Sequence, residues 1–111
     1  MTVTEGSQGD IWLQDQARSV ATRFTFRPGR SYLPVWAPDG SRLVFAARGA
    51  NTGGTAILQK QIGGNVPEES LLPARINQLP FDWSPDGKWI VYQTQGESTA
   101  LDLWLLPMYG D

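Results

Sequence analysis

The side chains that could do chemistry in this chain are mainly carboxylates, because the sequence contains no His and no Cys. Their absence excludes Ser-His-Asp and Cys-His catalysis, thiolate metal ligands and disulfides. Asp39 and Asp86 are the most distinctive carboxylates, and each lies between a Pro and a Gly. They stand 47 residues apart in separate turns. We therefore expect each to hydrogen-bond within its own turn and not to form an acid–base pair.

Two further features resemble binding sites but lack an essential part. The loop with Gly49, Gly53 and Gly54 is not followed by Gly-Lys-Ser/Thr, and no helix is expected there to bind a phosphate. Asp10 and Asp102 precede similar apolar segments, where each is expected to orient a loop or the start of a strand. The sequence thus predicts no catalytic residue, no metal ligand and no cofactor.

The two Pro-Asp-Gly turns belong to a longer motif that occurs twice. The matched positions are Trp36, Pro38, Asp39 and Gly40 in the first copy and Trp83, Pro85, Asp86 and Gly87 in the second. The apolar segments that begin at Asp10, Ala56 and Asp102 follow one another at steps of 46 residues. A period of this length is typical of propellers, solenoids and repeat arrays. We expect both tryptophans to be structural, packing between repeats, and not to bind a ligand.

Each Pro-Asp-Gly turn is expected to join two short strands. Pro at the second position and Gly at the fourth are typical of a type I turn closed by a left-handed glycine, which joins two antiparallel strands. Segments rich in β-branched and aromatic residues predict strands at 10–13, 20–26, 32–37, 42–47, 55–61, 69–72, 79–84, 88–94 and 101–106. No helix is expected.

Several of these strands are apolar at consecutive positions. Leu43 to Phe45, Ile90 to Tyr92 and Leu103 to Leu106 do not alternate apolar with polar residues, as a half-exposed antiparallel sheet would. Continuous apolar runs favour strands that are buried on both faces. The blades of a propeller are buried in this way, because each lies between two neighbours.

The composition limits which classes of partner are expected. The chain has 111 residues, nine basic and eleven acidic, and a net charge of −2. This near-neutral charge argues against a non-specific nucleic-acid-binding protein, which normally has a basic face. No apolar run approaches the roughly 20 residues needed to cross a bilayer. The first nine residues are polar and show no signal peptide.

The repeated Trp-(Ser/Ala)-Pro-Asp-Gly motif, followed by an (Ile/Leu)-Val-(Phe/Tyr) strand, resembles the repeat of TolB-like β-propellers, which are relatives of the tryptophan-aspartate repeats. The likeness extends from about Asp10 to the end of the chain. It implies an all-β fold of antiparallel four-stranded blades that together form an incomplete propeller. Similar repeats occur in the sensor propellers of bacterial membrane-anchored serine/threonine kinases and in prolyl-oligopeptidase-type peptidases.

The repeat divides the chain into a polar lead (1–9), the second half of a blade (10–30), a complete blade (31–77) and the first three strands of a further blade (78–111). Propellers usually have at least about four blades. The chain is therefore expected to be either a segment of a longer propeller, which we favour, or one protomer of a ring. A segment of an exported family member would be periplasmic or otherwise extracytoplasmic.

The resemblance implies a non-enzymatic segment that binds a protein or acts as a scaffold. The alternative is the non-catalytic propeller portion of a kinase or peptidase of the kinds named above, whose catalytic domain would lie elsewhere. A protein partner is expected, with a peptide or small ligand as alternatives, and open blade edges would allow self-association. Neither nucleic acid nor membrane insertion is expected. By analogy with propellers, the expected exposed contact residues precede each innermost strand: Arg30, Ser31, Tyr32, Ile76, Asn77 and Gln78.

Overall fold

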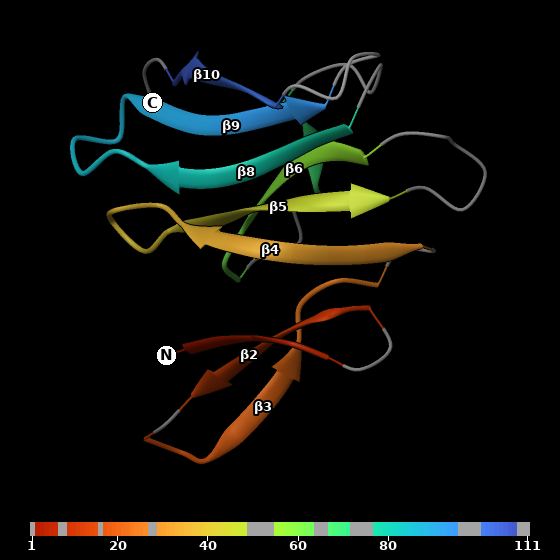
Figure 1. Cartoon of the computed structure of the whole chain (residues 1–111). Coiled ribbons are helices and arrows are strands. Elements are labelled where there is room, and N and C mark those ends of the chain that lie inside the picture. The colour runs from red at the N-terminus through yellow and green to blue at the C-terminus, as the bar shows by residue number, and fades with distance from the viewer. Residues whose placement is uncertain are drawn as a thin grey trace.

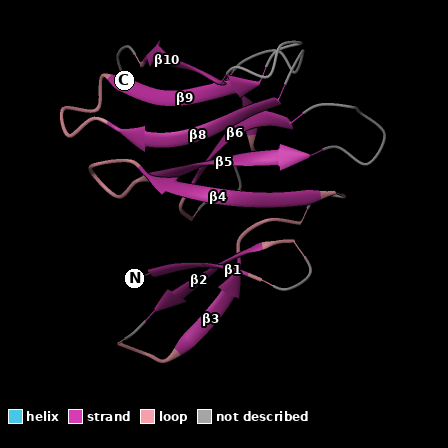
Figure 2. Cartoon of the chain, in the orientation of Figure 1, coloured by secondary structure: helices cyan, strands magenta, loops and turns pink. Residues whose placement is uncertain are grey.

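Strands are the only regular elements in the part of the chain that the computed structural model describes, namely residues 2–6, 9–15, 17–26, 29–48, 55–63, 67–71, 77–95 and 101–108. The strands are β1 (Thr2–Glu5), β2 (Ile11–Asp15), β3 (Val20–Arg23), β4 (Arg30–Trp36), β5 (Arg42–Arg48), β6 (Thr55–Gln61), β7 (Glu69–Ser70), β8 (Asn77–Trp83), β9 (Trp89–Gln95) and β10 (Leu101–Pro107). Figure 2 shows this all-β architecture. Within these ranges there is no helix of the length and apolarity needed to cross a membrane.

The strands form three antiparallel sheets. Sheet A has the order β1-β2-β3, sheet B the order β4-β5-β6-β7, and sheet C the order β10-β9-β8. Figure 1 shows them one above another, with sheet A at the bottom of the view and sheet C at the top. Contacts join β1 and β2 to β4, and β4, β5 and β6 to β8, so sheet B lies between the other two. The predicted all-β fold with antiparallel sheets is confirmed.

Strand β1 was not expected, because residues 1–9 were predicted to be only a polar lead. Its pairing with β2 places Val3 opposite Leu13. Val3 packs against the buried cluster that contains Leu13, while the alternate residues Thr2 and Thr4 are exposed. Strand β1 is paired with β2 along its whole length, and its one apolar residue among β-branched neighbours gives only a weak sequence signal. Sheet A thus has three strands where two were expected, and the division of the chain into blades stays a prediction.

Sheet B is buried on both faces. Leu43, Phe45 and Leu58 belong to one core cluster, which they share with Ile11 and Leu13 of sheet A. Val44 and Ile57 belong to a second cluster, together with Trp83 and Ile90 of sheet C. Successive residues of a strand point to opposite faces, so Leu43 and Val44 enter different clusters although they are adjacent. The predicted two-sided burial of this apolar run is confirmed.

The same prediction is wrong for strand β10. Leu103, Trp104 and Leu105 are 65%, 51% and 59% exposed. Leu106 packs against the second core cluster, and Leu105, its neighbour along the strand, must point to the opposite face. The described residues include no sheet that covers this outer face of sheet C. Of this apolar run only Leu106 packs against the core, and the other three residues are mostly exposed.

Candidate functional site

The two Pro-Asp-Gly turns have nearly the same hydrogen bonds. The amide of Gly40 donates to the carbonyl of Ala37, and that of Gly87 donates to Ser84, both at 2.9 Å. Both glycines have a positive φ, of 74° and 77°. This is the left-handed conformation that glycine adopts without a steric penalty. The type I turn with its left-handed glycine, predicted from the sequence, is thus present in both copies.

Each aspartate is held by its own turn. The Oδ1 atom of Asp39 accepts hydrogen bonds from the hydroxyl (2.7 Å) and the amide (3.0 Å) of Ser41. The Oδ1 atom of Asp86 accepts one from the hydroxyl of Ser84 (2.6 Å) and one from the amide of Lys88 (3.0 Å). In both cases the side-chain hydroxyl, followed by the backbone amide, lowers the pKa of the carboxyl group.

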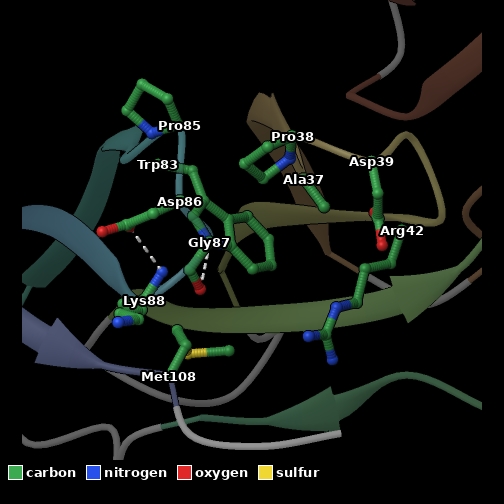
Figure 3. A pocket seen from close by; sticks show the side chains of 10 residues that line it. All are labelled: Ala37, Pro38, Asp39, Arg42, Trp83, Pro85, Asp86, Gly87, Lys88 and Met108. Carbon is green, nitrogen blue, oxygen red and sulfur yellow. Dashed lines mark hydrogen bonds between the residues drawn. The ribbon is translucent and has the colours of Figure 1, made fainter.

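The turns nevertheless lie side by side and enclose a cleft of about 380 Å³. Figure 3 shows the ring of Trp83 between them, with Asp39 and Asp86 on opposite sides. The other lining residues are Ala37, Pro38, Arg42, Pro85, Gly87, Lys88 and Met108. Because each carboxylate is already bonded within its turn and has a lowered pKa, neither is suited to accept a proton near neutral pH.

Trp83 is the larger of the two buried side chains that line this cleft, the other being Ala37. It is 5% exposed, belongs to the core cluster between sheets B and C, and donates from Nε1 to the carbonyl of Gly87 at 3.1 Å. The guanidinium of Arg42 lies 5.3 Å from the centre of its ring. Trp36 is only partly buried and packs against the cluster between sheets A and B. The Trp83 ring is therefore not free to stack with a ligand across its whole face.

Arg42 connects the cleft to the outer strands of sheet B. Its Nη1 atom donates to Gln59 Oε1 at 3.1 Å, and Gln59 Nε2 donates in turn to Glu69 Oε1. The cation is thus shared between an aromatic ring and an amide that a carboxylate fixes. These contacts give the Arg42 guanidinium partners from the chain itself. The cleft therefore resembles a structural contact between the two turns more than a ligand-binding site.

A second hollow has a different lining. A groove of about 390 Å³ lies between strands β4 and β8, the edge strands of sheets B and C. It is lined by Leu33, Pro34, Val35, Leu79, Pro80, Phe81 and Gln93. Leu33 and Phe81 are 38% and 66% exposed. An exposed hollow with six apolar side chains and one amide is suited to an apolar group.

Irregular backbone shapes this groove. The pairing of β4 with β5 shifts register between Tyr32 and Val35, and the pairing of β8 with β9 shifts between Pro80 and Asp82. Leu33, within the first shift, has a φ of 54°. Such a conformation is rare for a bulky residue and costs roughly 1–3 kcal/mol. Strain of this kind is often found where a fold presents a functional side chain.

The residues expected to contact a partner are not all exposed. Arg30 is exposed, and its guanidinium lies 4.7 Å from the centre of the partly buried Tyr32 ring. Ser31 and Gln78 are only 1% and 7% exposed, so the expectation of exposure is wrong for these two. Both lie within strands, β4 and β8, and not in loops. The side chains of Ser31 and Gln78 therefore point into the packed sheets, while the side chain of Arg30 remains accessible to a partner.

Asn77 begins strand β8, and Ile76 lies outside the described residues. Sequence reasoning overlooked the groove, which starts only a few residues farther along the same two strands. Its signal was present, because Pro34 and Pro80 interrupt segments that otherwise read as strands. Pro within a strand indicates an edge or a bulge. The role of the predicted contact residues stays a prediction.

No protein-family model matches the sequence, and none of the curated protein sequences is significantly similar to it. Solved structures are similar. Putative TolB from Agrobacterium tumefaciens has a TM-score of 0.77 at 23% identity, over 96% of this chain and 40% of that one. TolB from Acinetobacter baumannii has a TM-score of 0.68 at 20% identity, over 95% and 26%. This chain thus spans less than half the length of either protein, and over that length it has the fold of a TolB-type β-propeller, of which it forms an incomplete part.

Proposed function

We propose that this chain is a non-enzymatic binding segment, which receives an apolar side chain of a protein partner in the groove between β4 and β8. The observation that carries the proposal is the exposure of Phe81, which stands 66% exposed at the wall of an apolar hollow. Large apolar side chains exposed around a concave site are typical of interaction surfaces. The expected contact residue Arg30 begins β4, one of the two strands that form the groove.

The groove favours insertion of a side chain over addition of a strand. β4 and β8 are edge strands, and an extended peptide could in principle pair with such an edge. Pro34 and Pro80 have no amide hydrogen to donate, and both pairings shift register here. Prolines and bulges on edges oppose pairing with another chain. This also opposes self-association through these two edges.

The hydrogen bonds and contacts of Asp39, Asp86 and Arg42 within the chain support a role without catalysis. Asp39 and Asp86 are hydrogen-bonded within their turns and have lowered pKa values. The described residues contain no group of three or more Asp or Glu that could hold a metal ion. Arg42 is engaged with Trp83 and Gln59. The groove between β4 and β8 has a concave apolar surface, which is suited to binding an apolar side chain of a partner.

Selection of binding peptides would test the proposal. Random twelve-residue peptides displayed on phage would be selected on the purified chain, and their affinities measured by fluorescence anisotropy. We expect selected peptides to share an apolar anchor residue and to lose at least about tenfold in affinity for Phe81→Ser, since anchors in pockets dominate binding energy.

Phe26→Ser provides the matched control. Phe26 is exposed to nearly the same extent, 69%, but does not line the groove. Its loss should leave the affinity of the selected peptides unchanged. Equal binding to wild type and Phe81→Ser, or equal losses in both variants, would show that the groove is not the binding site.

A further inference from the structure

Asp-Gly, the dipeptide in which aspartate isomerises most readily, occurs twice in this sequence, at Asp39 and at Asp86. In this reaction the backbone nitrogen of the glycine attacks the side-chain carboxyl carbon, the carboxyl group leaves as water, and a five-membered succinimide forms. Water then adds to the ring. Addition at the side-chain carbonyl restores aspartate, whereas addition at the main-chain carbonyl leaves isoaspartate, in which the main chain runs through Cβ and Cγ. Glycine favours the attack because it has no Cβ beside the nitrogen.

Both folded turns oppose this attack. In each copy the glycine amide donates to the carbonyl of the first turn residue at 2.9 Å. The Oδ1 atom of each aspartate accepts from one hydroxyl and one amide. The nitrogen and the carboxyl group can therefore react only after the turn opens locally, and the turn that opens more easily should react faster.

The two turns differ at their first residue, which is Ala37 in one copy and Ser84 in the other. The hydroxyl of Ser84 donates to Asp86 Oδ1 at 2.6 Å and accepts from the amide of Trp89, which begins β9, at 3.0 Å. Ala37 has no hydroxyl, so the aspartate of the first turn accepts only from Ser41. The carboxylate of the second turn is thus linked to a strand, and that of the first turn is held by a single exposed residue.

An indole strengthens the second turn further. Trp83 is 5% exposed and donates from Nε1 to the carbonyl of Gly87 at 3.1 Å, which anchors this glycine to the core between sheets B and C. Within the described ranges, no side chain donates to the carbonyl of Gly40, which is exposed. Opening of the second turn therefore breaks two hydrogen bonds that have no counterpart in the first.

We propose that Asp39 is a modification site at which the folded chain forms isoaspartate, and that Asp86 is protected by its turn. Exposure does not separate the two residues, because both are exposed. Hydrogen bonds lower the pKa of both carboxyl groups, so ionisation does not separate them either. One additional hydrogen bond reduces the open fraction of a turn by about fivefold. Isoaspartate should therefore form at least about fivefold faster at Asp39 than at Asp86.

Mass spectrometry of the aged chain measures the two sites separately. Trypsin cleavage divides them, since peptide 31–42 contains Asp39 and peptide 76–88 contains Asp86. The folded chain is incubated at physiological temperature and mildly acidic pH, and isoaspartyl peptides are separated by chromatography and identified by electron-transfer fragmentation. The same chain in concentrated denaturant is the reference. There both sites should react faster than in the folded chain and at nearly equal rates, because neither turn is formed.

Exchange of the first turn residue gives matched variants. Ser84→Ala removes the link to β9 and should raise the rate at Asp86 by about fivefold while the rate at Asp39 stays unchanged. Ala37→Ser offers the first turn the same link, to Asp39 and to the amide of Arg42, and should slow the reaction at Asp39 by a similar factor. If Ala37→Ser loses the wild-type circular dichroism spectrum, Ser84→Ala alone decides the role of the link.

Equal rates at the two sites of the folded chain, or a faster reaction at Asp86, would overturn the proposal. A preference for Asp39 that persists in denaturant would also overturn it, because the cause would then be the local sequence and not the folded turn. So would a folded chain that forms no isoaspartate while the denatured chain forms it at both sites. An unchanged rate at Asp86 in Ser84→Ala would show that the serine link does not protect this turn.

Discussion

At the scale of single residues, Trp83 is the largest buried side chain in the core cluster between sheets B and C. Its indole is almost fully buried and bonded to the carbonyl of Gly87, whereas Trp36 at the equivalent position is only partly buried. Trp83 packs within the cluster between sheets B and C, and the guanidinium of Arg42 lies over its ring. Residues at equivalent positions of a repeat can therefore contribute different amounts to the stability of the fold.

We expect Trp83→Ala to lower the free energy of unfolding by about 3–5 kcal/mol, because truncating a large buried aromatic residue leaves a cavity. Trp36→Ala should cost less. Urea denaturation followed by circular dichroism measures both variants. A loss below about 1 kcal/mol for Trp83→Ala, in a variant that still folds, would contradict its place in the core.

The turn carboxylates predict a dependence on pH. Hydrogen bonds from the serine hydroxyls lower the pKa of Asp39 and Asp86 below the ordinary value of 3.8. A carboxyl group with a lowered pKa in the folded state stabilises the fold above its unfolded pKa, and this contribution is lost as pH falls through the folded value. The affected window thus lies below about pH 4.

Asp39→Asn/Asp86→Asn removes these two titrations while keeping a side-chain oxygen. We expect the wild type to melt at a higher temperature than this variant at neutral pH, and the difference to shrink as the pH is lowered toward about 2. Thermal melts across the range measure it. A difference that stays constant down to the lowest pH would mean that charge on these residues does not contribute.

At the scale of elements, the Pro-Asp-Gly hairpin turn is the best-determined unit. Residue types at four positions predicted the turn, its left-handed glycine and the two strands that it joins, and the structure has all of these in both copies. The prediction succeeded because every determinant is local. Nothing distant has to be known to place Gly40 or Gly87 in a left-handed conformation.

Gly87→Ala should therefore destabilise the chain by about 1–2 kcal/mol through its backbone alone. A Cβ atom at this position would meet no atom within 4 Å, so steric overlap with neighbours does not contribute. Gly87→Asn should lose less, because Asn tolerates the left-handed region better than Ala. Equal losses for the two variants, measured by denaturation, would show that another effect dominates.

Features that depend on contacts between distant residues were not predictable from the sequence. Strand β1 pairs with β2, and its Val3 packs against the core between sheets A and B, a contact that no local pattern reveals. The burial of Ser31 and Gln78 depends on how the sheets stack. The groove between β4 and β8 needs two strands from different sheets. In each case the residue types can be read from the sequence, but the distant residues that they contact cannot.

At the scale of the whole molecule, stability comes from two interfaces between three sheets. Ile11 lies in the first interface and Ile57 in the second, while the equivalent Leu103 lies on an open face. Residues with the same place in the repeat should thus differ sharply in what they contribute to a single chain.

We expect Ile11→Ala and Ile57→Ala to cost about 2–5 kcal/mol each. Leu103→Ala should cost less than about 0.5 kcal/mol at low protein concentration, as exposed substitutions usually do. Denaturation curves at one dilute concentration compare the three variants. A Leu103→Ala loss as large as that of Ile57→Ala under these conditions would contradict the exposed position of Leu103.

The two-sided burial of strand β5 has a consequence for how its register is chosen. A slip by one residue normally exposes the apolar side of a strand and is therefore rejected. In β5, Leu43 and Val44 are both apolar and fully buried, so a slipped strand would again present apolar side chains to both neighbouring sheets. Hydrophobicity alone thus discriminates poorly between alignments. The Asp39–Ser41 hydrogen bonds and the left-handed Gly40 fix the turn that joins β4 to β5, and a tight turn of fixed geometry restricts the register of the two strands that it connects.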